Sequence, residues 1–378
     1  MDSQTLRQAA INRVRLRRRK QKLPAYGQLR GANLSGWLIP EPWVCPTLFE
    51  GTGASTEQEL QQALGTTEYN ERLRQHLESF ITEADFRRMA LIGLNAVRIP
   101  VPWYAFGVQS EGKTYIPLID YIDRAFEWAN QYEIAVILTL ATVPGGQGDA
   151  HEPTTAPNYI AEWHASHNGR YAALEVLEKL AIRYGEDDAL AGIELLDAPV
   201  MRVRQGLFAM SDGIPIHYLR NYYRDAYARI RAHMPASKAI IFSDSGHPER
   251  WRGFMRGSTY ENIMIDVHVY HYRDQFAQDI TSPKGIVQAI VRTKASIELA
   301  QQTGFPVLVG EWSGAAVLSS SRVTPEGRAA YERVFIANQL SAFKQCAGWF
   351  FQTWKTEKRI PAWDARVALG TLERAMLE

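Results

Sequence analysis

The sequence is poor in cysteine and has no long uninterrupted hydrophobic run. Its 378 residues include only Cys45 and Cys346, outside any CxxC or Cys/His spacing, which argues against a disulfide framework and a zinc site. No stretch approaches the roughly 18 apolar residues of a membrane span, and the N-terminus lacks the apolar core of a secretory signal. We therefore expect a cytoplasmic protein without metal or cofactor, secreted only if a leader has been removed.

An excess of charge is also missing, because 42 Lys and Arg residues balance 41 Asp and Glu residues. This balance argues against nucleic acid as a partner. The exception is local: eight basic residues and no acidic one lie between Arg7 and Lys22. We interpret residues 1–25 as a solvated basic arm across the bottom of the following domain, residues 26–378. The alternative is that the arm contacts an anionic surface.

Short β-branched runs alternate with longer segments of helical period, a pattern typical of parallel strands joined by helices. We count eight strands, so the sequence predicts an α/β fold, a single (β/α)₈ TIM barrel. The predicted strands are Leu29–Asn33, Asn95–Val101, Ala135–Ala141, Gly192–Leu196, Ala239–Asp244, Ile263–Tyr270, Pro306–Trp312 and Gly348–Trp354. The predicted helices are Glu83–Ile92, Ile119–Gln131, Tyr171–Tyr184, Ile216–His233, Ile286–Gln302 and Pro325–Gln345. Residues 40–79 read as an elaborated loop with a short helix at Glu57–Leu64.

Barrel enzymes build their sites at the C-terminal ends of the strands, which meet at one mouth. The residues at these predicted ends are Arg98, Ala141, Asp197, Ala198, Asp244, His268, Tyr270, Glu311 and Trp354. Glu311 stands out because it interrupts the apolar run Val307–Trp312, where a carboxylate is unfavourable unless it is paired or used. The sequence therefore predicts a polar site at the mouth that contains Glu311.

Several motifs resemble the exo-β-1,3-glucanases of glycoside hydrolase family 5, in the right order between about residues 29 and 363. The matching segments are Arg30–Leu38, Glu41–Trp43, Leu48–Glu50, Phe80–Phe86, Gly93–Pro100, Gly192–Leu196, Val309–Ser313 and Thr353–Glu357. The resemblance implies hydrolysis of β-glycosides with retention, which requires two carboxyl groups about 5 Å apart. It implies that Glu311 is the nucleophile and that Arg98 keeps it ionised. Four residues would line the sugar subsite: Glu41, His268, Tyr270 and Trp354.

The chain departs from the family pattern at three neighbouring positions. The family has Asn-Glu-Pro after the fourth strand, whereas this chain has Asp197-Ala198-Pro199, so a methyl group replaces the general acid. A family histidine after the third strand is replaced by Ala141. Since Asp197 adds a carboxylate close to Glu311, we expect the two to titrate as a coupled pair with one raised pKa. We interpret three changes around one subsite as divergence rather than a single engineered substitution.

Three hypotheses follow. In the first, Glu311 still attacks a β-glucoside while Asp197, a water or the substrate supplies the proton, so that ordinary hydrolysis is impaired. In the second, the chain is an inactive pseudo-glycosidase that binds a small saccharide. In the third, Asp197 and Glu311 perform acid/base chemistry on a substrate that is not a glycoside. The loop residues Asp149, His151 and Glu152 could replace the missing acid, although we favour a solvated loop.

Overall fold

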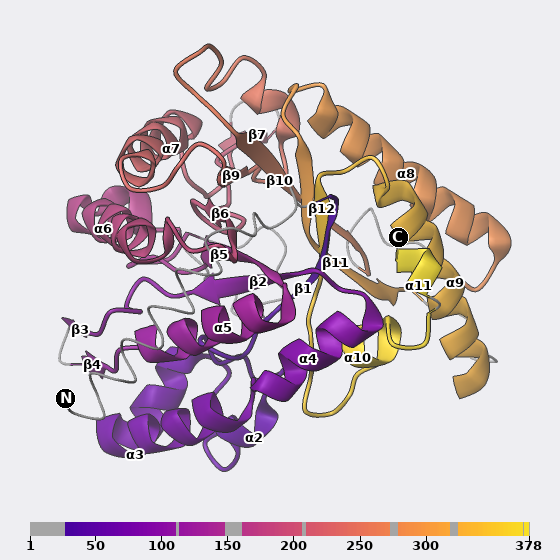
Figure 1. Cartoon of the computed structure of the whole chain (residues 1–378), viewed down its shortest axis with the longest axis horizontal. Helices are drawn as coiled ribbons and strands as arrows, with labels where there is room; N and C mark the ends of the chain where they lie inside the picture. Colours follow the sequence, from indigo (N-terminus) through magenta and orange to yellow (C-terminus); the bar gives the residue numbers. More distant parts are fainter. Residues whose placement is uncertain are drawn as a thin grey trace, which may run out of the picture.

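The chain forms a closed barrel of eight parallel strands surrounded by helices (Figure 1). The computed structural model describes residues 27–110, 113–147, 161–205, 209–272, 279–317, 324–372 and 374–377. This architecture confirms the predicted single (β/α)₈ TIM barrel. The predicted basic arm, residues 1–25, and the loop candidates Asp149, His151 and Glu152 lie outside the described residues.

The eight barrel strands follow one another around the barrel in the order β1-β12-β11-β10-β9-β6-β5-β2, with β2 closing on β1. Their bounds are β1 Leu29–Asn33, β2 Ala96–Val101, β5 Ala135–Leu140, β6 Leu190–Glu194, β9 Ala239–Ser243, β10 Ile263–His271, β11 Val307–Ala316 and β12 Gly348–Phe351. Two predicted strands, Gly192–Leu196 and Gly348–Trp354, extend two and three residues past the observed ends of β6 and β12. Because β6 ends at Glu194 and β12 ends at Phe351, Asp197 and Trp354 lie in the loops that follow.

The principal helices cover the outside of the barrel. They are α3 Glu57–Ser79, α4 Glu83–Ile92, α5 Ile119–Tyr132, α6 His167–Tyr184, α7 Ile216–Arg231, α8 Pro283–Gln301 and α9 Pro325–Phe343. The shorter helices are α2 Pro46–Phe49, α10 Ala365–Ala368 and α11 Arg374–Leu377, with 3₁₀ turns η1 Trp163–Ala165 and η2 Pro248–Trp251. Two small hairpins, β3 Val108–Ser110 with β4 Lys113–Tyr115 and β7 Arg204–Gln205 with β8 Ala209–Met210, lie outside the barrel.

Helix α3 corrects the prediction that residues 40–79 form mainly a loop. The Thr56 side chain accepts a hydrogen bond from the backbone N–H of Glu59, which begins the helix in the usual way. The chain then continues in helical form to Ser79, interrupted only at Gly65, where φ is 70°. Glycine reaches this left-handed conformation without steric penalty, so the helix bends there and resumes. The sequence analysis had stopped the helix at this glycine.

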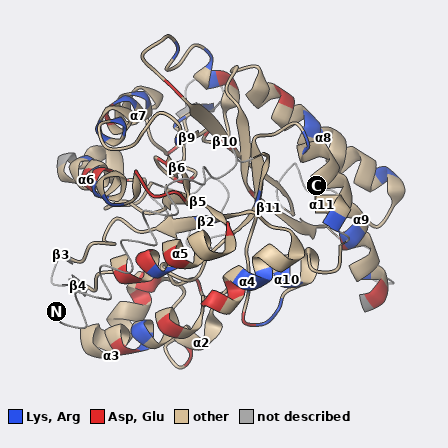
Figure 2. Ribbon diagram, viewed as in Figure 1, with Lys and Arg blue, Asp and Glu red and all other residues tan. Residues whose placement is uncertain are grey.

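The hydrophobic core explains why the barrel strands are so apolar. Strands β2, β5 and β9 are buried at every residue, because a parallel strand in a barrel is covered on both sides. Outside the core both signs of charge are present, as Figure 2 shows on α5. In the described part of the chain, no helix combines the length and the apolar character needed to cross a membrane.

Candidate active site

A completely buried arginine, Arg98 on β2, contacts the carboxylates that gather toward the C-terminal ends of the strands. It donates to Glu194 Oε2 at 2.9 Å, to Glu311 Oε1 at 3.2 Å and to Asp197 Oδ1 at 2.5 Å. A fourth carboxylate, Asp266, lies 3.9 Å from its Nη2. Burial disfavours the charged guanidinium, but the carboxylates outweigh this and raise the pKa of Arg98 above its usual value. Arg98 is therefore a permanent cation inside the barrel.

Glu311, on β11, is oriented by two hydrogen-bond donors. Its Oε1 accepts from Arg98, and its Oε2 accepts from the Tyr270 hydroxyl at 2.8 Å. Its side chain is 13% exposed at the barrel mouth. Burial raises the pKa of Glu311; His268 counteracts this effect, and the neighbouring Asp197 adds to it. The direction agrees with the coupled titration expected for Asp197 and Glu311.

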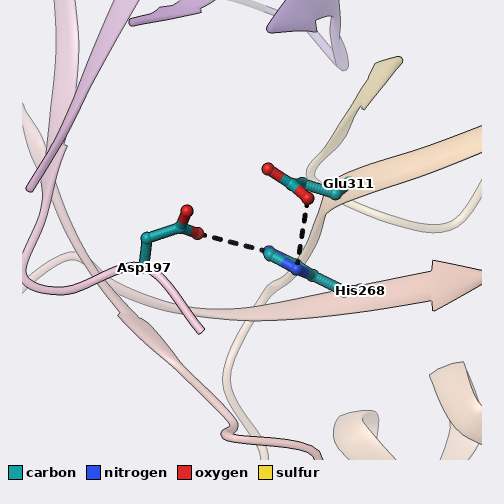
Figure 3. Close-up of side chains that lie close together, drawn as sticks. All are labelled: Asp197, His268 and Glu311. Atoms are coloured by element: carbon teal, nitrogen blue, oxygen red, sulfur yellow. Dashed lines mark ion pairs between the residues drawn. The ribbon is translucent and has the colours of Figure 1, made fainter. Parts of the chain in front are cut away.

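His268 lies beside Glu311 because β10 and β11 pair with these two residues in register. Its Nδ1 is 3.6 Å from Glu311 Oε2, and its Nε2 is 3.0 Å from Asp266 Oδ2 and 3.7 Å from Asp197 Oδ1. Figure 3 shows the imidazole between the other two labelled side chains. Burial would lower the pKa of His268, but Glu311 and Asp266 raise it to about 10. At neutral pH the site therefore contains a second cation.

The backbone before Glu311 is held by side chains from two other strands. The Gly310 N–H donates to Asp266 Oδ1 at 2.6 Å, and Asn33 Nδ2 donates to the Gly310 carbonyl at 2.9 Å. Asn33 Oδ1 also accepts from Arg98 at 2.8 Å. A Cβ atom on residue 310 would lie 2.3 Å from the Asp266 carboxylate oxygens, so glycine is required for this approach. This packing fixes the position of the Glu311 backbone along the barrel axis.

The loop after β6 brings Asp197 toward Glu311. The Asp197 N–H donates to the Leu140 carbonyl at 2.9 Å, and its side chain is 18% exposed. One ligand atom each of Asp197, His268 and Glu311 lie within 4.8 Å of one another, so the two carboxylates share the mouth. Ala198 is buried and has φ of 31°, a conformation uncommon for a residue with a side chain. At Ala198 the chain offers only a methyl group.

The spacing of Asp197, His268 and Glu311 would allow a metal ion to bind. The electrostatics do not favour one. The Arg98 guanidinium already contacts both carboxylates, and the raised pKa of His268 keeps its imidazole protonated at neutral pH. A cation would have to compete with these two positive charges, so we assign no metal to this cluster.

A group of aromatic side chains connects Glu41 with the mouth. The Trp363 ring lies 5.7 Å from the Tyr270 ring, 5.0 Å from Tyr272 and 5.4 Å from Trp43. The indole of Trp43 donates to Glu41 Oε2 at 2.9 Å. Glu41 is therefore two aromatic rings away from Tyr270, which itself donates to the nucleophile candidate. The sequence analysis had not selected Trp363.

Trp354 is placed differently from the prediction. Its side chain is 0% exposed, and its indole donates to Asp85 Oδ1 on α4 at 2.8 Å. The prediction that Trp354 lines the sugar subsite is therefore wrong for this structure. The reason is that β12 ends at Phe351, so the alternation that would direct Trp354 into the barrel no longer applies. Trp363, by contrast, is only half-buried.

Two buried carboxyl groups were missed by the sequence analysis. Glu194 Oε2 accepts from Arg98 and from the Thr139 hydroxyl at 2.8 Å, and Asp266 accepts from Gly310. Burial raises the pKa of Glu194 to about 8, against the lowering effect of Arg98. Both residues interrupt apolar strands in the same way as Glu311, so the signal that identified Glu311 also identifies them.

The remaining predicted positions are less central. Ala141 is half-buried after β5, where its carbonyl accepts from the Gln147 side chain at 2.6 Å. His271, which follows the predicted Tyr270 on β10, points away from Glu311, since its Nε2 lies 2.8 Å from the Thr293 hydroxyl on α8. Asp244 is buried at the end of β9, and burial raises its pKa to about 7.

A closed eight-stranded α/β barrel with carboxyl groups at the C-terminal ends of its strands is the architecture of barrel glycoside hydrolases. Residues 55–350 match the family model described as Cellulase (glycosyl hydrolase family 5). The chain belongs to glycoside hydrolase family 5, and it is a β-glucanase-like enzyme of the O-glycosyl hydrolase type.

Individual relatives agree with this assignment. The chain is 32% identical to a probable glucan 1,3-beta-glucosidase A of Aspergillus niger, over 96% of this chain and 91% of that protein. It is 30% identical to a glucan 1,3-beta-glucosidase of Blumeria graminis, over 89% and 84% of the two chains. Among solved structures, a rutinosidase from Aspergillus niger has a TM-score of 0.75 at 17% identity, covering 94% of this chain and 99% of that one. Endoglucanase Cel5A of Thermotoga maritima has a TM-score of 0.56 at 14% identity, over 92% and 95%.

Proposed function

We propose that this protein acts on a β-glucoside or β-glucan through a covalent glucosyl intermediate on Glu311. The observation that carries the proposal is the pair of donors on this carboxylate, Arg98 on one oxygen and Tyr270 on the other. Both donors stabilise the ionised form that can attack, and the exposed part of the side chain opens to the mouth.

In the first step a Glu311 oxygen attacks the anomeric carbon, and the bond from that carbon to the leaving oxygen breaks. The result is a glucosyl ester of Glu311. In the second step an acceptor attacks the same carbon from the opposite face and displaces the carboxylate, so the product keeps the β configuration. Positive charge that develops on the sugar in each transition state is stabilised by the nearby carboxylates Asp197 and Glu311.

The proposed weakness of the site is proton donation to the leaving oxygen. The family position for the general acid corresponds to Ala198, whose methyl group has no proton to give. Asp197 makes its ion pair with Arg98 as a carboxylate. Loss of a positioned general acid reduces the rate on the order of 10²–10⁴-fold. We therefore expect slow hydrolysis of ordinary glucan linkages.

The sugar subsite is proposed to include Glu41, His268, Tyr270 and Trp363. Tyr270 and His268 lie against Glu311, and the half-buried Trp363 packs against Tyr270. Flat C–H faces of a glucose ring stack on such aromatic surfaces. The hydrogen bond of Trp43 with Glu41 extends this row of aromatic side chains away from Glu311.

A mechanism-based label tests the proposal. The full chain is incubated with 2-deoxy-2-fluoro-β-D-glucosyl fluoride, whose fluoride leaves without protonation, and intact mass is measured. We expect one added fluoroglucosyl group in the wild type, located on Glu311 by peptide mapping, and none in Glu311→Gln. The variant Glu298→Gln on the outer helix α8 is the matched control and should be labelled normally. No label on the wild type, or a label on another residue, would overturn the proposal.

A second candidate function is sugar binding without turnover, favoured by the absence of a proton-bearing side chain at Ala198 and the ion pair of Asp197 with Arg98. In that case titration calorimetry with laminari-oligosaccharides should show binding in both the wild type and Glu311→Gln, while the fluoroglucosyl label is absent from both. Labelling of Glu311 would exclude this alternative.

A further inference from the structure

In the part of the chain that the structure describes, each proton-bearing side chain that contacts Glu311 is paired with a carboxylate. Among the described residues, the proton-bearing side chains within contact of Glu311 are Arg98, His268 and Tyr270. Arg98 also contacts Asp197, and His268 lies against Asp266. None of these groups can lose its proton to a leaving oxygen without leaving a buried carboxylate unpaired, which is strongly unfavourable.

Ala198 is the second reason why the site lacks a proton donor for the leaving group. It follows directly on Asp197, whose ligand atom lies within 4.8 Å of that of Glu311. The side chain of residue 198 is buried and apolar. The site thus combines Glu311, a carboxylate oriented by two hydrogen-bond donors, with Ala198, a residue that has no proton to donate.

We propose that the natural donor is a β-glucoside whose leaving group departs as a stable anion, either a glucose ester of a carboxylic acid or the glucoside of an acidic phenol. This inference rests on the proposed role of Glu311 and adds the substrate class. A carboxylate leaves readily because its conjugate acid has a pKa of about 4, and a phenolate has one of about 10. A sugar alkoxide is a far less stable anion, since its conjugate acid is a much weaker acid, close to water in strength.

The first step then needs no proton transfer. A Glu311 oxygen forms a bond to the anomeric carbon, and the electron pair of the breaking carbon–oxygen bond leaves with the carboxylate or phenolate. In the family mechanism the same acid/base residue later activates water. Without it, attack by neutral water is slow, because the water must lose its proton to bulk solvent.

An anionic acceptor avoids this second difficulty. A carboxylate attacks the anomeric carbon with its own electron pair, displaces Glu311 and needs no base. The site is therefore suited to transfer a glucosyl group from one anionic oxygen to another, and hydrolysis is the slower outcome. Formation of the ester neutralises Glu311, so Arg98 and His268, which both lie against it, then face one carboxylate fewer and an anionic acceptor is repelled less.

The leaving group is tested first on the wild-type protein. We measure kcat/KM for a series of aryl β-glucosides of graded phenol acidity, for 1-O-benzoyl-β-glucose, and for methyl β-glucoside and laminaribiose. We expect the benzoyl ester and the most acidic phenols to react on the order of 10²–10⁴-fold faster than the two alkyl glycosides. The benzoyl ester and the aryl series separately identify which of the two leaving groups the site prefers. We expect azide to accelerate turnover and to give β-glucosyl azide.

Two variants of Ala198 test whether the absence of an acidic proton at this position limits the rate. Ala198→Glu supplies a carboxyl group, and Ala198→Gln supplies the same shape without an acidic proton. We expect Ala198→Glu to raise turnover of laminaribiose by on the order of 10²-fold and to suppress glucosyl azide formation, whereas Ala198→Gln changes neither. If the positive φ of residue 198 prevents either variant from folding, the wild-type series alone decides the question.

Similar wild-type kcat/KM values for methyl β-glucoside and for the most acidic aryl glucoside, together with a fall in rate at high pH, would overturn the inference, because some other group would then donate the proton. Asp244→Asn would show whether that donor is the buried carboxyl at the end of β9. Such a result would leave Glu311 as nucleophile. If Glu311 is not labelled and no glycoside in the series turns over, the proposed function itself fails, and the inference fails with it.

Discussion

Arg98 Nη1 and Glu311 Oε1 lie 3.2 Å apart although 213 residues separate them along the chain. The barrel makes this contact possible, since β2 and β11 lie on either side of the β1–β12 pair. The contact places the permanent positive charge of Arg98 beside Glu311, the residue proposed to attack the sugar. Much of the behaviour of the site follows from this ion pair and from the three other carboxylates that share Arg98.

Replacing Arg98 by methionine should strongly destabilise the fold. The change leaves Glu194, Asp197 and Glu311 without their common cation in a buried place, and breaking buried ion pairs typically costs about 3–5 kcal/mol. Urea unfolding would measure the free energy of unfolding. Arg124→Met is the control, because the Arg124–Glu78 pair is exposed and should contribute within about 1 kcal/mol. Equal effects in both variants would contradict the prediction.

Replacing Tyr270 by phenylalanine should weaken catalysis and shift its pH dependence. The Tyr270 hydrogen bond lowers the pKa of Glu311, so its loss raises that pKa further. Because only the ionised carboxylate attacks, the acidic limb of kcat/KM for an activated aryl glucoside should move to higher pH. A hydrogen bond to a charged group contributes about 1.5–3 kcal/mol, or roughly 10- to 150-fold in kcat/KM.

The control for that variant is Tyr184→Phe, which removes a similar hydroxyl contact to Asp123 on α5, outside the barrel. It should leave the pH profile unchanged. A Tyr270→Phe protein whose acidic limb stays in place, or moves to lower pH, would show that the hydroxyl does not stabilise ionised Glu311.

Stability should fall as pH rises through the alkaline range. His268 has its pKa raised from 6.5 to about 10 in the folded protein, so its stabilising contribution is fully present below about pH 6.5 and is lost as pH approaches 10. Glu194 acts in the same direction between about pH 4.5 and 8, because burial raises its pKa to about 8 and its folded form retains the proton longer. At each of these two groups the folded state binds more protons than the unfolded state across the stated range.

Urea unfolding of the wild type and of His268→Gln at about pH 6 and pH 9.5 checks this prediction. The wild type should lose stability at the higher pH, and the variant should lose less. A wild-type protein that becomes more stable with rising pH would contradict the raised pKa of His268.

Two tryptophan variants should separate sugar binding from folding. Trp363→Ala removes a half-buried ring beside Tyr270, so we expect weaker binding of laminari-oligosaccharides in calorimetry with a modest change in stability. Trp354→Ala removes a fully buried ring bonded to Asp85, so we expect a loss of about 3–5 kcal/mol in unfolding free energy. If Trp354→Ala weakened saccharide binding and Trp363→Ala instead lowered the free energy of unfolding, Trp354 would be the residue that stacks on the sugar.

Much of the fold could be predicted from the sequence because its signals are local. Strand β1 has the predicted bounds, and the predicted strands Ile263–Tyr270 and Pro306–Trp312 largely overlap β10 and β11. Helix α3 could not be predicted in full, because Gly65 reads as an end in the sequence, whereas the packing of the helix on both sides of this kink continues it. Local propensity is a weak guide wherever tertiary contacts extend an element.

The amino-acid sequence alone determined the barrel, its apolar strands and the presence of Glu311 inside one of them, since burial and alternation leave a readable period in the chain. Only the tertiary structure decided that four carboxylates share Arg98, that Trp354 packs against Asp85, and that Trp363 lies beside Tyr270. These contacts join residues far apart in the chain, and their geometry depends on where each strand ends and how its neighbours are aligned. A linear pattern of side chains carries no information about such distances.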